Sequence, residues 1–246
     1  MIESARVIEI ACVLAPGGGV FVEAGANDGI RQSNSLALER ELGWTGLLVE
    51  PSPKAFSELK KNRPGCYLVR AALVSPTKAG QMINGAFRDG HLTGTVNTEL
   101  LQLAVDLPKS KFESFLVRSR TVLGIKPKTT LRSVPTTTLS LALGEAQISK
   151  VDLLSLDVEG YELEALAGLD FEQVKPKAIL LEMRKDDAWE IVRLLIGFGY
   201  VLVENMSNFD ETESHTWTRD HEDFLFVTYD ELLRNADLQR VLQRKP

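Results

Sequence analysis

Short apolar runs that end in or beside a carboxylate recur along the chain, and this repetition constrains the fold more than any other feature. The runs are "VFVEA" at 20–24, "GLLVE" at 46–50, "VDLLSLD" at 151–157 and "KAILLEM" at 177–183. Each has the length and near-continuous apolar character of a buried strand, and each is followed by a helical pattern. Such alternation is typical of parallel strands joined by right-handed crossovers. The sequence therefore predicts an α/β fold with helices on both faces of a mostly parallel sheet.

Further elements follow from periodicity and from helix-terminating residues. We expect a third strand at 66–74 and, before the first strand, a short helix at 3–14 that ends at Pro16-Gly-Gly-Gly. Helices are expected at 33–42, at 51–61 with Pro53 in the first turn, at 136–143 and beyond Gly160. Another helix should carry Trp189, Val192 and Leu195 on one face.

The last two strands should differ from the others in direction. "YVLVE" at 200–204 and "DFLFVT" at 223–228 are separated by a polar loop that has no room for a crossover helix of normal apolar content. Strands joined without such a crossover pair antiparallel.

The regular alternation stops between 75 and 135, where the chain is rich in Gly, Thr, Lys and Arg. Short helices are expected near 99–105 and 111–123. A structureless loop of that length is unusual in a compact domain, so we interpret 76–134 as an insertion that serves as a lid or a substrate-recognition element. A mobile linker is the alternative.

Length and composition favour a single domain that acts on small molecules. The chain has 246 residues and a formal charge of −6, which argues against binding nucleic acid or anionic lipid through bulk charge. The chain has only two cysteines, Cys12 and Cys66, which lie in no metal-ligand spacing. With so few cysteines, we expect no disulfide framework. No apolar stretch reaches membrane-spanning length and no secretory leader is evident, so a cytoplasmic protein is expected.

The acidic residues at the ends of the predicted strands suggest a ligand site. These residues are Glu23, Glu50, Asp157 and Glu182. In open α/β sheets, ligands bind outside the carboxyl ends of the strands. Any one carboxylate there can instead cap a helix or pair with a lysine, but four at one edge of a sheet favour a site.

A glycine-containing loop follows the first strand, and its residues indicate what kind of ligand binds there. Gly25 and Gly29 permit close backbone approach, and the amides of the following helix are expected to point at the ligand. Glu50, at the end of the next strand, can accept hydrogen bonds from ribose hydroxyls. The pair predicts an adenosine-containing cofactor without separating a methyl donor from a nicotinamide. The GxGxxG fingerprint and a Tyr-x-x-x-Lys pair are both absent, which disfavours an NAD-dependent oxidoreductase. A non-catalytic nucleotide-binding protein stays an alternative.

Three blocks together resemble the FkbM methyltransferases, a branch of the class I S-adenosylmethionine-dependent enzymes. The blocks are "FVEAGANDG", "GWTGLLVEPSPKAF" and "VDLLSLDVEGYELEALAGLDFEQVKPKAILLEM", and the resemblance covers about residues 19–74 and 134–204. It implies a Rossmann-like sheet of seven strands with an antiparallel last strand, and S-adenosylmethionine as the cofactor. It also implies O-methylation of a sugar, glycan or other natural product.

Carried over residue by residue, the resemblance implies where the cofactor binds. The first loop would surround its methionine end, Glu50 would hold the ribose, and the adenine would lie between the segment after Glu50 and the end of the third strand. The cofactor-binding residues implied in this way are Glu23, Gly25, Ala26, Asn27, Asp28, Gly29, Glu50, Pro51, Ser52, Ala71, Ala72 and Asp157. Asp157 would also face the transferring methyl group and contact the acceptor.

O-methylation requires a base, because an alkyl hydroxyl is a poor nucleophile until its proton is shared. Asp157, Glu182 and His221 are the preferred candidates; the flanking Asp220, Glu222 and Asp223 should raise the basicity of His221. Glu159, His91 and His215 are less favoured, and Glu159 serves equally well as a helix cap. Mg²⁺ held by Asp157, Glu182 and a third oxygen ligand is a further hypothesis that spacing in the sequence does not test.

Overall fold

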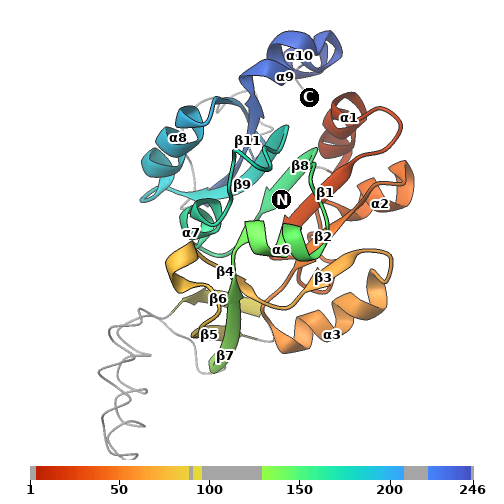
Figure 1. Ribbon diagram of the computed structural model, residues 1–246. Helices are drawn as coiled ribbons and strands as arrows, with labels where there is room; N and C mark the ends of the chain where they lie inside the picture. Colours follow the sequence, from red (N-terminus) through yellow and green to blue (C-terminus); the bar gives the residue numbers. More distant parts are fainter. Residues whose placement is uncertain (1–3, 89–90, 96–128, 208–220, 245–246) are drawn as a thin grey trace, which may run out of the picture.

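A seven-stranded sheet forms the centre of the computed structural model, which describes residues 4–88, 91–95, 129–207 and 221–244 (Figure 1). Its order is β10-β11-β9-β8-β1-β2-β3. The strands are β1 (Val20–Ala24), β2 (Thr45–Val49), β3 (Tyr67–Val69), β8 (Leu153–Leu156), β9 (Ala178–Arg184), β10 (Tyr200–Asn205) and β11 (His221–Thr228). Strand β11 runs in the opposite direction to the other six strands of this sheet. The predicted α/β class and the antiparallel final pair are confirmed.

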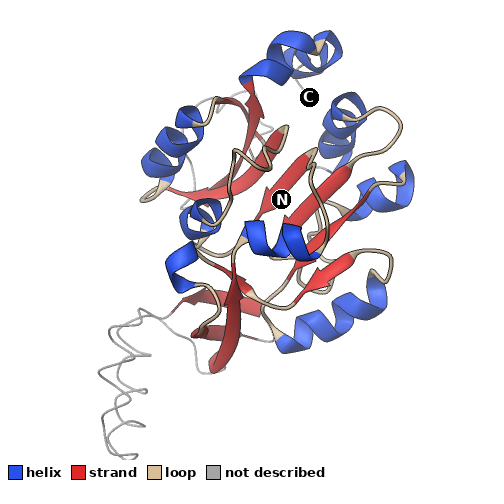
Figure 2. Ribbon diagram, in the orientation of Figure 1, coloured by secondary structure: helices blue, strands red, loops and turns tan. Residues whose placement is uncertain are grey.

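Helices lie on both faces of the sheet (Figure 2). They are α1 (Ser4–Leu14), α2 (Leu36–Leu42), α3 (Pro53–Asn62), α6 (Leu139–Glu145), α7 (Glu162–Ala167), α8 (Ala188–Gly197), α9 (Tyr229–Arg234) and α10 (Ala236–Gln243). Successive strand residues face opposite layers: Val22 packs in a core with α6, α7 and α8, whereas Phe21 packs in a second core with α1, α2 and α10. Burial on both faces explains why the strands are continuous apolar runs.

Local sequence signals fix the starts of two helices. Ser52 caps α3 by accepting a hydrogen bond from the N–H of Ala55, and Pro53 occupies the first turn as predicted. Thr138 caps α6 by accepting from the N–H of Leu141 at 3.0 Å. The helix predicted at 136–143 therefore begins at 139, because the threonines before the cap belong to strand β7 (Thr129–Thr137).

The third predicted strand, 66–74, is divided between two sheets. Its first part is β3 of the main sheet, and its last part is β4 (Ala72–Leu73), which pairs with β7. The two residues between them, Arg70 and Ala71, carry the chain from one sheet to the other. A run of strand-like residues interrupted only by Arg70 does not reveal such a change of partner, because both halves are extended.

The described parts of the predicted insertion form a small second sheet in the order β4-β7-β5-β6. Strands β5 (Met82–Arg88) and β6 (His91–Thr95) pair antiparallel, and β5 also pairs antiparallel with β7. A 3₁₀ turn, η1 (Pro76–Lys78), precedes them. Figure 1 shows this sheet at the lower end of the main sheet. The helices predicted near 99–105 and 111–123 lie outside the described residues.

Helix α8 buries Leu195 and packs Val192 against the core as predicted, but Trp189 faces solvent. Trp189 is 74% exposed, whereas Ile191 and Leu195 are fully buried. Residues four apart share one face of a helix, so Ile191 and Leu195 define the buried stripe, with Val192 at its edge. The assignment of Trp189 to that face was wrong. The spacing of the aliphatic residues, not the large indole ring, decides which face of the helix is buried.

Helix α10 completes the second core, and the sequence pattern predicted neither it nor α9. Leu238 and Val241 of α10 pack in the same cluster as Val7 and Ile10 of α1. Figure 1 shows α10 at the top of the molecule, next to α1. None of the helices in the described ranges has the length and apolar composition needed to cross a membrane.

Candidate functional site

The four predicted carboxylates lie at the carboxyl ends of adjacent strands. Glu23 and Glu182 belong to β1 and β9, whereas Glu50 and Asp157 come directly after β2 and β8. Because β2, β1, β8 and β9 are neighbours and all run parallel, the four residues gather along one edge of the sheet. The sequence placed these strand ends correctly.

A cavity opens at this edge; we call it the first cavity. Seven of the twelve predicted cofactor residues line it: Gly25, Asn27, Glu50, Pro51, Ala71, Ala72 and Asp157. Glu23, Ala26, Asp28, Gly29 and Ser52 do not. The small sheet contributes Ile83, Gly85 and Val134 to the wall, and the segment after β8 contributes Val158, Glu159 and Tyr161. The second sheet is therefore part of the site, which the sequence pattern did not predict.

Glu50 is a buried carboxylate that links two loops of the first cavity. One oxygen accepts a hydrogen bond from the N–H of Asn27 at 2.9 Å, and the other accepts from the N–H of Ser52 at 2.7 Å. Burial raises the pKa of Glu50 to about 7, although both N–H donors act to lower it. Each carboxylate oxygen has a second lone pair, so Glu50 can accept further hydrogen bonds from a ligand in the cavity.

Only glycine fits at position 25. Its φ is +84°, and a Cβ atom there would lie 1.8 Å from the carbonyl oxygen of Asp157. The two segments are held together by the N–H of Asp157, which donates to the carbonyl of Ala24 at 3.0 Å. Asn27 has φ +52°, a left-handed conformation that asparagine tolerates better than most residues.

Six backbone amides of this loop donate hydrogen bonds within the protein. Gly25 and Ala26 donate to the carbonyl of Val49, Asn27 donates to Glu50, Gly29 donates to the carbonyl of Ala26, and Ile30 and Arg31 donate to the Asp28 carboxylate. The following helix, α2, begins only at Leu36, whose N–H donates to the Ser33 hydroxyl. The N–H of Leu36 therefore already has a partner, and for the next residues of α2 the expected contact with the ligand stays a prediction.

Glu23 stabilises the segment that connects the glycine loop to α2. Its buried carboxylate accepts hydrogen bonds from the Ser33 hydroxyl at 2.8 Å, the Asn34 N–H at 2.7 Å and the Ser35 hydroxyl at 2.5 Å. With these partners it fixes the segment that leads into α2. Burying a charge is tolerated when hydrogen bonds satisfy it in this way.

Arg63, at the end of α3, holds the same segment from the other side. It is 1% exposed and donates hydrogen bonds, each 3.1 Å long, to the Gly29 carbonyl and the hydroxyls of Ser33 and Ser35. Its guanidinium also pairs with Glu39 of α2. A buried arginine looks like any surface arginine in a sequence, so no local signal could have identified it.

A second hollow lies beside the first cavity; we call it the second hollow. It contains all three predicted catalytic residues, Asp157, Glu182 and His221, together with Asp223, Ser207, Asn34 and Arg40. Asp157 and Gln32 line both hollows. Asp157 therefore lies in the wall between them, where a group bound in one hollow can reach a molecule bound in the other.

Strand pairing brings the catalytic candidates together. Asp223 of β11 lies opposite Glu182 of β9, and His221 lies opposite Arg184. The His221 Nε2 atom is 3.6 Å from the Glu182 Oε1 atom. Asp223 accepts a hydrogen bond from the Ser207 hydroxyl at 3.0 Å. The sequence indicates Asp223 only as a neighbour of His221. Its position on the antiparallel strand β11 places it in the second hollow.

Burial, followed by neighbouring negative charges, raises the pKa of carboxyl groups in the second hollow. Burial, and then the negative charges of Glu159 and Asp223, raise the pKa of Asp157 to about 7. Burial, followed by the charge of Asp157, raises the pKa of Glu182 to about 8, and burial also raises the pKa of Asp223. A carboxylate with a pKa near the working pH is suited to take up a proton.

The segment after β8 has a different internal support from the predicted one. The Glu162 carboxylate accepts hydrogen bonds from the N–H groups of Val158 and Gly160, both at 3.1 Å, which is the capping role considered for Glu159. Glu159 instead has φ +57°, lines the first cavity and pairs with Arg184 at 3.5 Å.

The remaining two histidine candidates lie where the structure describes no side chain. His91 begins β6, and His215 lies outside the described residues. Within the described part of the chain, no group of three or more His, Cys, Asp or Glu side chains is placed to hold a metal ion. The hypothesis of a Mg²⁺ site at Asp157 and Glu182 finds no support in this arrangement.

Comparison with known proteins supplies the family. The profile described as the Methyltransferase FkbM domain matches residues 23–216. No curated protein matches the sequence.

Solved structures of methyltransferases resemble the chain at low identity. A TehB-like SAM-dependent methyltransferase from Corynebacterium glutamicum ATCC 13032 Kitasato is 14% identical, with 93% of this chain and 88% of that chain covered and a TM-score of 0.43. A precorrin-6y C5,15-methyltransferase from Geobacter metallireducens GS-15 is also 14% identical, with 92% and 88% covered and a TM-score of 0.42. A putative RNA methyltransferase from Pyrococcus horikoshii is 10% identical, with 92% and 82% covered and a TM-score of 0.41. These similarities do not bear on what the chain methylates.

Proposed function

Because the chain belongs to the FkbM methyltransferase family and is an S-adenosylmethionine-dependent methyltransferase, we propose that it methylates a hydroxyl group of a sugar, glycan or other natural product. Family membership decides between the methyl donor and a nicotinamide, which the glycine loop left open. The position of Asp157 in the wall between the first cavity and the second hollow carries the proposal. It implies that the cofactor binds on one side of this residue and the acceptor on the other.

The residues of the first cavity suit the chemistry of S-adenosylmethionine. Glu50 offers carboxylate oxygens to the two ribose hydroxyls, and Ala72, Ile83 and Val134 form an apolar patch suited to an adenine ring. Pro51 and Ala71 border the same space. The described strands of the 76–134 insertion thus contribute to cofactor binding in this proposal, in addition to the lid or recognition role inferred from the sequence.

Asp157 acts as the general base in the proposed reaction. S-adenosylmethionine supplies a methyl group on a positively charged sulfur, and the acceptor oxygen displaces that sulfur in line. As the O–C bond forms and the C–S bond breaks, the hydroxyl proton passes to Asp157 and the C–S electron pair stays on the sulfur. Glu182 and His221 lie close enough to orient the acceptor or to relay the proton onward.

The charges of the second hollow favour an acceptor without negative charge. Asp157, Glu182 and Asp223 line it together with Glu41, and Arg40 and His221 are the basic residues among its described lining. Phosphate or carboxylate groups would be repelled wherever these carboxyl groups are ionised, whereas neutral hydroxyls can form hydrogen bonds with them in either protonation state. We therefore favour an uncharged polyhydroxylated acceptor over a nucleotide-sugar or a nucleic acid.

A screen for methyl transfer tests this proposal. Radiolabelled S-adenosylmethionine is incubated with the protein and with uncharged glycans, polyketides, nucleotide-sugars or RNA, and label in each acceptor is counted. Transfer to uncharged hydroxyl compounds is expected. Transfer only to nucleotide-sugars or RNA would contradict the acceptor class. The absence of a thermal shift with S-adenosylhomocysteine would favour a protein that has lost its cofactor site.

A further inference from the structure

Arg31 is the only basic side chain among the described residues that line the first cavity. The other charged side chains there are the carboxylates of Glu50, Asp157 and Glu159. The methionine end of S-adenosylmethionine carries a carboxylate as well as an ammonium group. Among the described lining residues, several carboxylates could pair with the ammonium group, whereas Arg31 is the one cation that could pair with the carboxylate.

Six of the loop amides already donate within the protein, which leaves the carboxylate few backbone donors. Nests of free backbone N–H groups commonly bind anions in glycine loops. Here the amides of Gly25, Ala26, Asn27, Gly29, Ile30 and Arg31 all donate to acceptors within the protein. Using any of them would break an existing hydrogen bond. A side-chain cation is therefore the better partner for the carboxylate.

Asp28 contacts Arg31, whose side chain lines the cavity and is 72% exposed. One oxygen of its carboxylate accepts hydrogen bonds from the N–H of Ile30 at 3.0 Å and the N–H of Arg31 at 2.8 Å. The other oxygen lies 3.4 Å from the Arg31 Nε atom. This contact uses the inner nitrogen of the guanidinium. Within the described ranges, the two terminal nitrogens have no hydrogen-bond or ion-pair partner.

We propose that Arg31 binds the carboxylate of the cofactor's methionine end through these two terminal nitrogens. The inference rests on the proposed function, since it needs S-adenosylmethionine in the first cavity. A planar guanidinium matches a carboxylate with two parallel hydrogen bonds, which a lysine does not reproduce. Asp28, predicted from the family resemblance to contact the cofactor, acts in this view by positioning Arg31.

Two ligands that differ in the methionine carboxylate test the inference. S-adenosylhomocysteine has the amino-acid end, whereas 5′-methylthioadenosine keeps the adenosine and the sulfur but lacks that end. Isothermal titration calorimetry on the full chain gives the dissociation constant of each ligand for the wild type and for Arg31→Gln. Arg31→Gln should weaken S-adenosylhomocysteine about ten-fold, the size of one charge-assisted interaction, and leave 5′-methylthioadenosine unchanged. Arg31→Lys should lose part of that affinity, because it keeps the charge without the fork.

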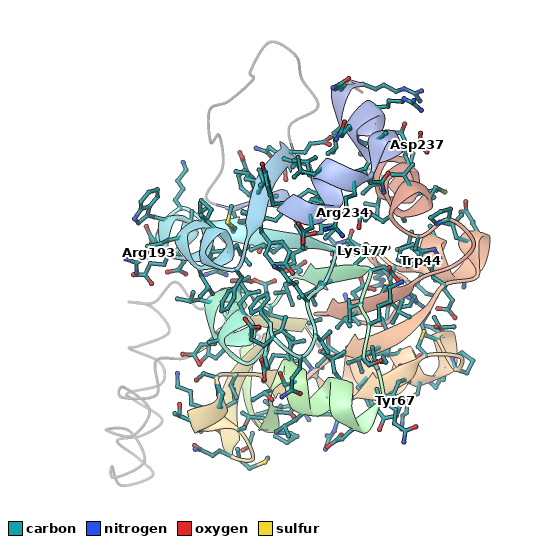
Figure 3. The ribbon with its side chains drawn as sticks, turned by 45° about the horizontal axis from the view of Figure 1, so that its top comes forward. Trp44, Tyr67, Lys177, Arg193, Arg234 and Asp237 are labelled. Atoms are coloured by element: carbon teal, nitrogen blue, oxygen red, sulfur yellow. The ribbon has the colours of Figure 1, made fainter. Side chains whose placement is uncertain are left out.

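Arg193→Gln is the matched control for the loss of one positive charge. Arg193 is exposed on α8 and lines neither the first cavity nor the second hollow. Figure 3 shows it at the left edge of the molecule. Its variant should bind both ligands as the wild type does. Equal weakening of the two ligands by Arg31→Gln, or unchanged binding of both, would overturn the inference. If neither ligand bound the wild type, the proposed function itself would fail, and this outcome is distinct from the other two.

Discussion

The carbonyl oxygen of Asp157 occupies the place that a side chain at Gly25 would need. A Cβ atom on Gly25 would lie 1.8 Å from that oxygen, far inside van der Waals contact. The loop after β1 therefore passes directly against the residue that we propose as the base. One glycine fixes how closely the cofactor loop and the acceptor side of the site approach each other.

Gly25→Ala should abolish cofactor binding. The methyl group meets backbone rather than a movable side chain, so the loop or the end of β8 must shift. Loss of the thermal shift with S-adenosylhomocysteine is expected. Gly43→Ala is the control, because Gly43 also has a positive φ of +65° but a Cβ there meets nothing within 4 Å. It should cost about 1 kcal/mol of stability and keep the shift. Equal effects of both variants would mean that backbone strain alone matters.

Asp157→Asn should lower turnover and leave cofactor affinity unchanged. Removing a general base lowers the rate by roughly 10²–10⁴. The wild-type kcat/KM should rise with pH through about 7, because the pKa of Asp157 is raised to about 7 and the base acts only when ionised. The variant should lose this rise. Weaker binding of S-adenosylhomocysteine would place Asp157 in the cofactor site instead. A rate that falls with EDTA and recovers with Mg²⁺ would contradict a base that acts without metal.

Glu50→Ala should weaken S-adenosylhomocysteine about ten-fold or more, since charge-assisted hydrogen bonds to the ribose are worth roughly 1.5–3 kcal/mol. The structure adds a second effect. Glu50 also accepts hydrogen bonds from the N–H groups of Asn27 and Ser52, so the variant removes one bond that anchors the loop after β1 and one that anchors the segment after β2. Glu58→Gln, on the exposed side of α3, is the charge-matched control. Calorimetry gives the affinities, and thermal denaturation checks that both variants fold. An unchanged dissociation constant would leave Glu50 a purely structural carboxylate.

The unliganded protein should lose stability between about pH 5 and pH 8. Glu50, Asp157 and Glu182 have pKa values of about 7, 7 and 8 in the folded protein, above their ordinary values of 4.5, 3.8 and 4.5. The folded state therefore binds more protons than the unfolded state in this range, and the free energy of unfolding falls as pH rises. Glu182→Gln should flatten the dependence in a series of thermal melts. A melting temperature that rises from pH 5 to pH 8 would contradict this assignment of the carboxylates.

The sequence determined those features that depend on local pattern. Apolar runs of strand length located β1, β2, β8 and β9, and the absence of a crossover helix before β11 indicated its direction. Ser52 and Pro53 indicated where α3 begins, because capping and φ restriction act within one turn. The strand ends in turn gave Glu50, Asp157 and Glu182. Parallel strands collect their carboxyl ends at one edge whatever the detailed packing.

Tertiary structure alone decided which partners these residues meet. The apolar run at 66–74 is divided between two sheets, and Ile191 rather than Trp189 faces the core of α8, because neighbouring elements select among faces that are locally equivalent. Arg63 is buried by α2 and the loop before it, and Asp223 reaches the second hollow through its pairing with Glu182. Hydrogen-bond partners such as those of Glu23 and Arg63 come from segments distant in sequence. Their positions are fixed by burial and strand order, which local pattern does not encode.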